Sequence, residues 1–387
     1  MLRGLRTFVF GMVSVLTPIY LAMLGFSPTY VGVSIFLVVL GNVSSNILLT
    51  WFGDVIGRRS LLIIFSLLTF VSGILLSSSS LYPPVLALAL FMGNISTTGT
   101  EAGPFQSIEV GVLPRFTGNR LGRVLGIYNL IGYSASSLGA LASSIPAYLG
   151  DKLVFVRLMY LIYAMAGLVM AIIYSALGNI EAGGRRPGLR GGLGRAAVVD
   201  IRNLSILFSV DAFGGGLVTQ SLLSYWFYVR YGVTLRELGL VFMVVNVVTA
   251  ISLVIAPLIA ERIGNLRTMV YTHLLSNVFL ILVPLAGSFM GSLAFLLLRQ
   301  SVSQMDVPTR QAFMAQIFSD EERVPANAVT NTARSIGSLP GPLIVGDLIS
   351  QGGLYSLPFI ISGSMKIMYD LTIYLMYRNR VRDNEIR

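Results

Sequence analysis

Ionisable residues lie within long apolar stretches of this 387-residue sequence, where charged groups are unfavourable and tend to be functional. Glu101 and Glu109 are eight residues apart, so on a helix they lie on nearly the same face, two turns apart. A carboxyl group removed from water takes up a proton more readily and can exchange it near neutral pH. Glu101, the deeper of the two, is therefore the first candidate for a proton-coupling site.

A second polar group of residues interrupts a later apolar stretch. Arg299 and Asp306 are seven residues apart and Asp306 and Arg310 are four apart, so all three share one helical face. Gln304 lies between them, and Pro308 can kink the helix and free a backbone carbonyl for a cavity. Arg299 and Gln304 lie deepest, and the guanidinium group of Arg299 is suited to holding a carboxylate or a phosphate.

Other ionisable residues have competing interpretations. Asp211 precedes a Gly214-Gly-Gly216 run, so it is a cavity residue or an anchor at the start of a helix. Arg334 lies well inside another apolar stretch. Glu109, Asp306 and Arg310 lie far enough from the centre to form ion pairs at a gate rather than to bind solute. Three further residues are interpreted as structural: the spacing of four predicts a pair between Lys366 and Asp370, and His273, the only histidine, is expected to pack near a loop.

Composition defines the elements that must position these residues. The chain is 55% hydrophobic and 11% charged, with a mean hydropathy of +0.78, whereas soluble domains contain about 25% charged residues. Apolar runs of about 20 residues follow one another, each long enough to cross a bilayer. The ten-residue alternation of a membrane β-barrel is not seen. The sequence predicts an all-α integral membrane protein, and the absence of cysteine excludes disulfides and thiolate metal sites.

Hydropathy and helix breakers predict about twelve spans. A Gly/Arg-rich segment without apolar periodicity divides them, which predicts an N-terminal six-helix bundle over residues 1–178, a linker over 179–200 and a C-terminal six-helix bundle over 201–387. The predicted spans are 7–25, 30–52, 60–79, 84–107, 121–148, 154–177, 203–229, 236–260, 268–287, 290–316, 325–349 and 355–377.

Arginine distribution predicts the orientation. Clusters of arginine lie before the first span and after the even-numbered spans, whereas most of the opposite turns are nearly uncharged. The positive-inside rule therefore places both termini in the cytoplasm and explains the net charge of +10 without nucleic acid. Lys152, Arg230 and Arg236 are exceptions that are expected at the outer surface.

A short charged turn between the second and third spans carries a family resemblance. Its sequence, Trp51-Phe-Gly-Asp-Val-Ile-Gly-Arg-Arg59, is similar to the cytoplasmic loop signature of the major facilitator superfamily, G-x-L-a-D-r-x-G-R-R/K. The matching residues are Asp54, Gly57, Arg58 and Arg59. Thr50 and Val55 stand where the signature has its opening glycine and its internal arginine.

The turn recurs in the second half of the chain, where Glu261 and Gly264 follow an equivalent apolar run and Arg267 lies just beyond. This recurrence indicates an internal duplication. The resemblance implies two pseudo-symmetric six-helix bundles around a central cavity, and a cytoplasmic gate in which Asp54 meets the start of span eleven. There, residues 319–322 predict a capping box. By the duplication, Glu261 is expected near residues 119–123.

Further stretches resemble a prokaryotic branch of the superfamily with the patterns D-A/S-F-G-G-G, G-x-E-x-G-P-F-x-x-I-E and M-D-V-P-T-R-Q. The resemblance supports Asp211, Glu101, Glu109, Asp306 and Arg310 as family positions. It supplies no substrate.

These observations predict the function class. The sequence lacks a P-loop, an H-E-x-x-H motif and a nucleophile–base constellation, so neither an enzyme nor an ATP-driven pump is expected. The prediction is a secondary transporter, working as a monomer in the cell membrane without cofactor or metal, that couples a small solute to protons. Export of drug-like or metabolite compounds, as an antiporter, is favoured slightly. The alternatives are import of a nutrient or organic anion, a gradient-independent facilitator, and a transporter-like sensor.

Overall fold

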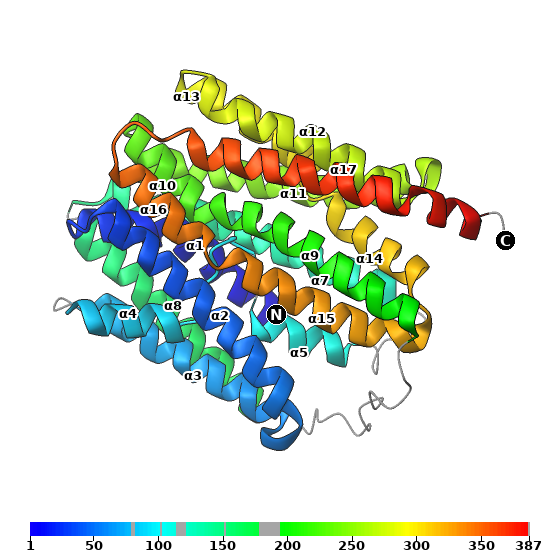
Figure 1. Cartoon of the computed structure of the whole chain (residues 1–387). Coiled ribbons are helices and arrows are strands. Elements are labelled where there is room, and N and C mark those ends of the chain that lie inside the picture. Colours follow the sequence, from blue (N-terminus) through cyan, green and yellow to red (C-terminus); the bar gives the residue numbers. More distant parts are fainter. Residues whose placement is uncertain (79–81, 101–102, 114–120, 151, 178–193, 386–387) are drawn as a thin grey trace. The chain divides into compact units, whose positions relative to one another are not determined.

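The computed structural model describes residues 1–78, 82–100, 103–113, 121–150, 152–177 and 194–385. Within these ranges the chain is helical and contains no strand (Figure 1). Eight helical segments there are long and apolar enough to cross a membrane, as the composition predicts. The helices before residue 178 are α1 (Leu2–Met23), α2 (Pro28–Ile56), α3 (Arg58–Ser77), α4 (Pro83–Met92), α5 (Pro104–Val112), α7 (Leu121–Ala142), the short 3-10 helix η2 (Ile145–Tyr148) and α8 (Lys152–Ala176).

The remaining helices follow the segment that was predicted as a linker. The first of them begins at Arg195, eight residues before the predicted span, so the end of the predicted linker is helical. The helices are α9 (Arg195–Leu217), α10 (Gln220–Tyr231), α11 (Leu235–Ile263), α12 (Asn265–Leu285), α13 (Phe289–Ser303), α14 (Asp306–Ile317), α15 (Asp320–Ser338), α16 (Gly341–Ser350) and α17 (Leu357–Glu385).

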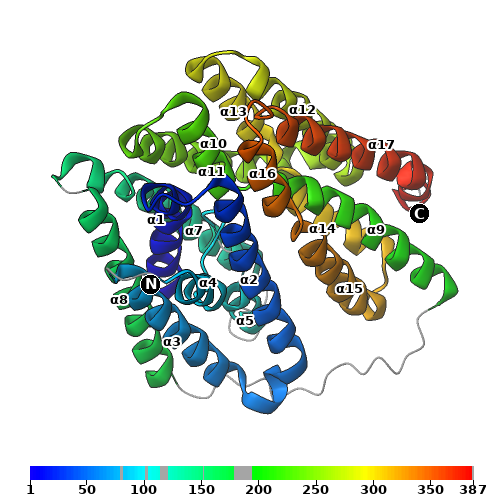
Figure 2. The same ribbon diagram turned by 60° about the vertical axis from the view of Figure 1, so that its left-hand side comes forward.

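Contacts group the chain into two compact units. Unit 1 contains α1 to α8 with η2, α10, the first part of α11 and the last part of α16. Unit 2 contains α9, the rest of α11, α12 to α15, the start of α16, and α17. In unit 1, α3 lies beside α8 and α1 beside α7 (Figures 1 and 2). In unit 2, α9 packs against α15, and α12 packs against α13 and α17. The bundle boundaries given by the sequence, 1–178 and 201–387, stay a prediction.

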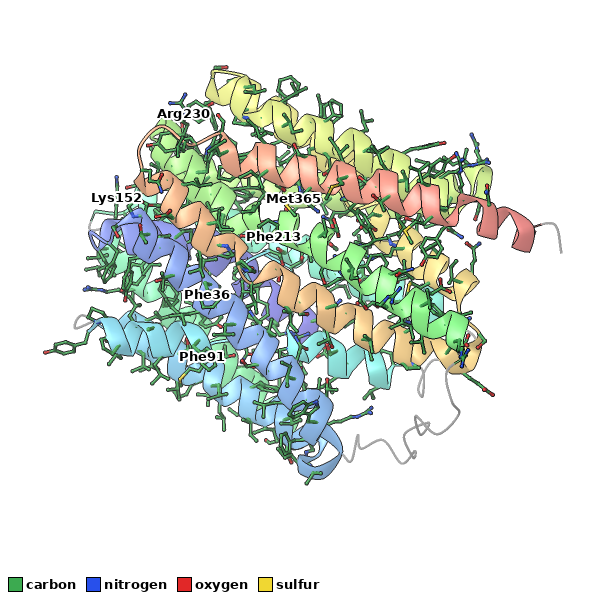
Figure 3. All side chains as sticks on the ribbon, viewed as in Figure 1. Phe36, Phe91, Lys152, Phe213, Arg230 and Met365 are labelled. Atoms are coloured by element: carbon green, nitrogen blue, oxygen red, sulfur yellow. The ribbon has the colours of Figure 1, made fainter. Side chains whose placement is uncertain are left out.

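Three basic residues that the sequence expects at the outer surface lie together in unit 1. Lys152, at the start of α8, and Arg230, near the end of α10, lie at one end of the helices (Figure 3). The guanidinium carbon of Arg236 is 5.2 Å from the ring centre of Tyr148, so this group lies beside η2.

The two turns of the duplicated motif have the same backbone geometry. Gly57 joins α2 to α3 with φ 91° and ψ 139°, and Gly264 joins α11 to α12 with φ 87° and ψ 155°. Each glycine carbonyl then accepts the first hydrogen bond of the next helix at 3.0 Å. A side chain at these positive φ values is strained, which explains why both copies of the motif keep glycine here.

Five predicted spans are not continuous helices, which corrects the sequence analysis. Span four divides into α4 and α5, span five into α7 and η2, span seven into α9 and α10, span ten into α13 and α14, and span eleven into α15 and α16. Local residues account for the breaks. Pro104 opens α5 at a position where no N–H is needed, Thr219 caps α10, and Pro340 precedes α16.

Side chains and neighbouring backbone groups donate hydrogen bonds to carbonyl groups of the irregular backbone in span four. Ser136 Oγ donates to the carbonyl of Gly99 at 2.6 Å, and Asn42 Nδ2 donates to the carbonyl of Ile95 at 2.8 Å. The N–H of Ser221 donates to the carbonyl of Thr97 at 3.0 Å. Non-helical backbone at membrane depth is tolerated only when protein or water supplies hydrogen-bond partners for its N–H and C=O groups.

Helix α1 approaches α7 closely at a glycine, which gives a testable prediction. A Cβ atom at Gly139 would lie 1.9 Å from the carbonyl oxygen of Phe8, whereas one at Gly126 in the same helix would meet nothing within 4 Å. Gly139→Ala is therefore expected to destabilise the protein by about 1–3 kcal/mol, measured as a lower melting temperature in detergent. The matched control, Gly126→Ala, should be neutral or slightly stabilising. Equal melting temperatures would contradict this close packing.

Candidate functional site

A group of charged side chains lies in the interior of unit 2, contributed by five helices. We call its seven residues the Asp211 cluster. They are Asp211 on α9, His273 on α12, Asp306 and Arg310 on α14, Arg334 on α15, and Lys366 and Asp370 on α17.

Asp211 is the centre of the cluster. Lys366 Nζ lies 2.7 Å from its Oδ1, and Arg334 Nη1 lies 2.8 Å from its Oδ2. Arg310 Nη1 is 3.9 Å from Oδ2, and His273 Nε2 is 3.7 Å from Oδ1. The Asp211 side chain is 3% exposed, so four cationic or potentially cationic groups surround one buried carboxylate.

His273 connects Asp211 to a second buried carboxylate. Its Nδ1 lies 2.8 Å from Asp370 Oδ1, while Nε2 faces Asp211. Asn277 Nδ2 donates to Asp370 Oδ2 at 3.0 Å. Tyr369 packs edge-on against the imidazole, with ring centres 6.0 Å apart. Because each ring nitrogen faces an acid, the imidazole can form an ion pair at both nitrogens when it carries two protons.

Two arginines complete the cluster on its less buried side. Arg310 Nη1 donates to Asp306 Oδ2 at 2.5 Å, and Asp306 is the first residue of α14. The guanidinium carbons of Arg310 and Arg334 lie 5.7 Å and 5.9 Å from the ring centre of Phe208. Arg334 is the most exposed of these cations, with 26% of its side chain accessible.

The cluster is electrically balanced when His273 is neutral, because three carboxylates oppose two guanidinium groups and one ammonium group. Uptake of one proton by His273 would leave a net charge of +1. A buried charge is strongly destabilising when its partner loses the opposite charge. A change in the charge of the His273 ring therefore alters the ion pairs that join helices α9, α12 and α17.

Unit 1 contains a smaller buried ion pair. Arg6 on α1 donates from Nη1 and Nη2 to the two carboxylate oxygens of Glu109 on α5, at 2.9 Å and 2.6 Å. Tyr174 Oη donates to Oε1 at 2.6 Å and Tyr128 Oη to Oε2 at 2.7 Å. Arg6 is fully buried. The carboxylate is thus held by four hydrogen bonds, a geometry typical of a rigid structural pair.

The structure brings together only part of the predicted coupling site. Asp211 lies in the cluster, whereas Arg299 is hydrogen-bonded to Gln300 and Gln304 lies in the break between α13 and α14. Glu101, the first candidate for coupling, lies outside the described residues. Among the predicted gate residues, Asp306, Arg310 and Arg334 join Asp211.

The predicted gate contacts at the duplicated turns are described only in part. The Asp54 side chain and residues 114–120 lie outside the described part. Glu261 and Arg267 are exposed. Arg58 begins α3, and Arg59 Nε donates to the carbonyl of Tyr174 at 3.2 Å. The capping box is confirmed, because the Ser319 N–H donates to Glu322 Oε2 at 3.3 Å at the start of α15.

Three interpretations from the sequence need correction. His273 is not a packing residue near a loop, since it is 4% exposed and faces two carboxylates. Asp211 does not anchor a helix start, because it lies in the last two turns of α9. Lys366 pairs directly with Asp211 instead of Asp370. The missed signal was the depth of these residues, since all three fall inside spans. Their partners lie 62–155 positions away in the sequence, so no local spacing reveals them.

In the described ranges, no group of three or more His, Asp or Glu side chains is arranged to hold a metal ion. The cluster instead combines acids with cations, as ionisable groups inside membrane spans usually do.

Comparisons with known proteins agree with this architecture. The family model described as Major Facilitator Superfamily matches residues 2–301 and 204–386. An uncharacterised membrane protein of Saccharomyces cerevisiae is 26% identical over 417 residues, covering 96% of this chain and 92% of the yeast protein.

Solved structures with the same fold are less similar in sequence. A D-xylose–proton symporter superposes with a TM-score of 0.76 at 15% identity, covering 96% of both chains. The nucleoside transporter NupG gives 0.72 at 12% identity and 97% of both chains. The inward-open xylose transporter XylE of E. coli gives 0.72 at 14%, covering 96% of this chain and 94% of that one.

Proposed function

Because this chain belongs to the major facilitator superfamily, we propose that it is a secondary active transporter that couples a small solute to protons through the Asp211 cluster. The observation that carries the proposal is the position of His273, with Asp370 at one ring nitrogen and Asp211 at the other. The coupling role that the sequence gives to Glu101 stays a prediction, because that residue lies outside the described residues.

Proton uptake can change the ion pairs that join the helices of unit 2. Lys366 and His273 both face the same oxygen of Asp211, at 2.7 Å and 3.7 Å. A protonated His273 competes with Lys366 for that oxygen, whereas a neutral one leaves it to Lys366. Arg334 and Arg310 face the other oxygen. A proton that favours one set of pairs shifts the equilibrium between conformations by its differential affinity.

The predictions on topology and gating are part of the proposal. The arginine distribution supports a cell-membrane location with both termini in the cytoplasm. The shared geometry of Gly57 and Gly264 supports a cytoplasmic gate built on the two turns. We propose a monomer as the transporting form, since all seven residues of the Asp211 cluster belong to one chain.

The proposed direction of transport follows from sequence features. Residues 132–139 of span five lack the Gly-Pro-rich run typical of drug efflux, and span eleven instead carries a Gly-Pro element, at the break between α15 and α16, which supports export by antiport. The alternative, import of a nutrient or organic anion with protons, uses the same cluster and differs in which state binds solute first.

The coupling proposal predicts that Asp370→Asn abolishes solute-driven proton movement. Neutralising Asp370 removes one of the two carboxylates that face the ring nitrogens of His273, so proton flux should fall at least ~10-fold, a factor that corresponds to about 1.4 kcal/mol. Sealed proteoliposomes with an imposed pH gradient and an internal pH dye would be supplied with cationic, anionic and sugar solutes, each added inside or outside. The side that triggers flux reports direction.

Asp347→Asn is the matched control because Asp347 is an exposed acid at the end of α16, outside the cluster. It should retain the flux of the unaltered chain. Solute movement without proton movement in all three proteins would refute coupling and favour a facilitator. Solute-driven proton flux that persists in Asp370→Asn would place the coupling elsewhere.

A further inference from the structure

One cation in the membrane-spanning part of unit 2, Arg299, has no carboxylate within 4 Å among the described residues. Arg299 lies ten residues after the start of α13 at Phe289, which is about 15 Å at a rise of 1.5 Å per residue. This is half of the roughly 30 Å hydrocarbon thickness of a bilayer. The guanidinium group of arginine keeps its charge in proteins, so a positive charge lies near mid-membrane depth.

The hydrogen-bond partners of Arg299 are neutral. Its Nη1 donates to Gln300 Oε1 at 2.6 Å, and that amide is held by Thr249 on α11, whose Oγ1 accepts from Gln300 Nε2 at 3.0 Å. Ser303 Oγ donates to the same amide oxygen at 3.0 Å. The Nε atom is removed from water and has no acceptor among the described residues. The guanidinium group is therefore oriented but not neutralised.

Other cations in the spans of unit 2 differ in this respect. Arg310, Arg334 and Lys366 each have a carboxylate oxygen within 2.8 Å, whereas no carboxylate in the described residues lies within 4 Å of Arg299. An arginine at the centre of a membrane helix is unfavourable by about 2.5–3.5 kcal/mol on insertion scales. A charge retained in such a position is typical of a residue that meets an anion during function.

The backbone next to Arg299 is also irregular. Helix α13 ends at Ser303 and α14 begins at Asp306, so Gln304 and Met305 interrupt the span one turn beyond the guanidinium group. Non-helical backbone at this depth lies inside protein or lines a water-filled cavity, and interrupted helices line the solute sites of many transporters. The break places Arg299 beside a segment suited to such a lining.

We infer that Arg299 is the recognition residue for an anionic group of the solute, a carboxylate or a phosphate, which it binds through its guanidinium fork. This inference rests on the proposed transport of a small solute but not on proton coupling. The described acids of unit 2 support an anion over a cation, because Asp211, Asp306 and Asp370 are already paired with cationic groups or His273.

The test compares matched pairs of probes in detergent, without a membrane gradient. The probes are benzoate with benzamide, nicotinate with nicotinamide, and glycerol 3-phosphate with glycerol, and the readout is the melting temperature over a concentration series. In the unaltered chain, at least one anion should stabilise the protein while its neutral partner does not. Arg299→Gln should abolish this difference, and Arg299→Lys should weaken anion binding ~10-fold or more because it loses the planar fork.

The melting temperature measured without any probe distinguishes a recognition role of Arg299 from a structural one. Removal of an unpaired buried charge should leave the melting temperature of Arg299→Gln equal to that of the unaltered chain or higher, whereas loss of a structural ion pair would lower it. Arg202→Gln, at an exposed arginine of α9, is the control and should retain anion binding.

Several outcomes would overturn the inference: neutral and charged partners that bind equally, no response to any anion, or an anion preference that survives in Arg299→Gln. A lower melting temperature of Arg299→Gln without probe would assign Arg299 a structural role. Because the assay involves no proton gradient, anion binding that persists in a chain without proton flux would refute coupling alone.

Discussion

Replacing Asp211 by asparagine is expected to lower the free energy of unfolding by about 3–5 kcal/mol, the usual effect of removing one partner from a buried ion pair. Asp211 is the shared partner of Lys366 and Arg334, at 2.7 Å and 2.8 Å, and its side chain is 3% exposed. Without the carboxylate, Lys366 has no acid within hydrogen-bond distance among the described residues. The measurement is the melting temperature in detergent, with a drop of roughly 6–20 °C.

The variant also removes one of the two acids that face His273, so transport coupled to protons should be lost as well. A double variant provides the control for stability. Asp211→Leu with Lys366→Met removes the most buried charged partner together with the acid, and Arg334, which is 26% exposed, can turn toward water. This double variant should recover at least half of the lost stability. If Asp211→Asn melts within about 1 °C of the unaltered chain, the ion pairs of the cluster do not stabilise unit 2.

Loss of Glu109 should have an effect of similar size in unit 1. Glu109→Gln leaves the fully buried guanidinium group of Arg6 without its carboxylate partner, so a loss of about 3–5 kcal/mol is expected. Tyr174 and Tyr128, which donate to the carboxylate at 2.6 Å and 2.7 Å, would lose a charged acceptor as well. The melting temperature in detergent again measures the effect.

A double-mutant cycle distinguishes a structural pair from a residue of the transport mechanism. Arg6→Met combined with Glu109→Met should cost much less than the sum of the single changes, because neither charge is then left alone. The double variant should also retain solute-driven proton flux, since neither residue belongs to the Asp211 cluster. If stability recovers but flux does not, Glu109 takes part in transport, and the gate role suggested by the sequence gains support.

The presence of the membrane-spanning helices and the duplicated turn were predictable because both depend on local sequence patterns. Apolar runs identify spans by length alone, and the acid-x-x-Gly pattern identifies the two turns at Gly57 and Gly264, which share a backbone conformation. The capping box at Ser319 was predictable for the same reason, since its two side chains are three residues apart.

The helix breaks were less accessible to sequence analysis. Hydropathy averaged over about 19 residues does not register two or three residues that leave the helix, as at Gln304–Met305 or at Val218–Thr219. Proline gave a local signal near most of the breaks, but it marked the start of the next helix rather than the break itself. Pro308, for example, lies inside α14, two residues after its start.

The site was predictable residue by residue but not as an assembly. Asp211, Asp306, Arg310 and Arg334 are conspicuous as charges inside spans. Their convergence with His273 depends on helix packing over long sequence separations. Arg6 was counted among loop arginines that set orientation, because a charge near a helix end has the same sequence signature whether it faces water or a buried carboxylate.

The ion pairs described above also set an order of events during biosynthesis. Arg6 and Glu109 are 103 residues apart and both lie in the first half of the chain, so their pair can form before the second half leaves the ribosome. Asp211 and Lys366 are 155 residues apart, and at 5–20 residues per second Asp211 waits about 8–30 s for the helix that carries Lys366. During that interval, helix α9 enters the bilayer with an incompletely paired acid. Helix α17, which carries Lys366, therefore completes the ion pairs of Asp211, so a truncation that removes α17 threatens the insertion of α9.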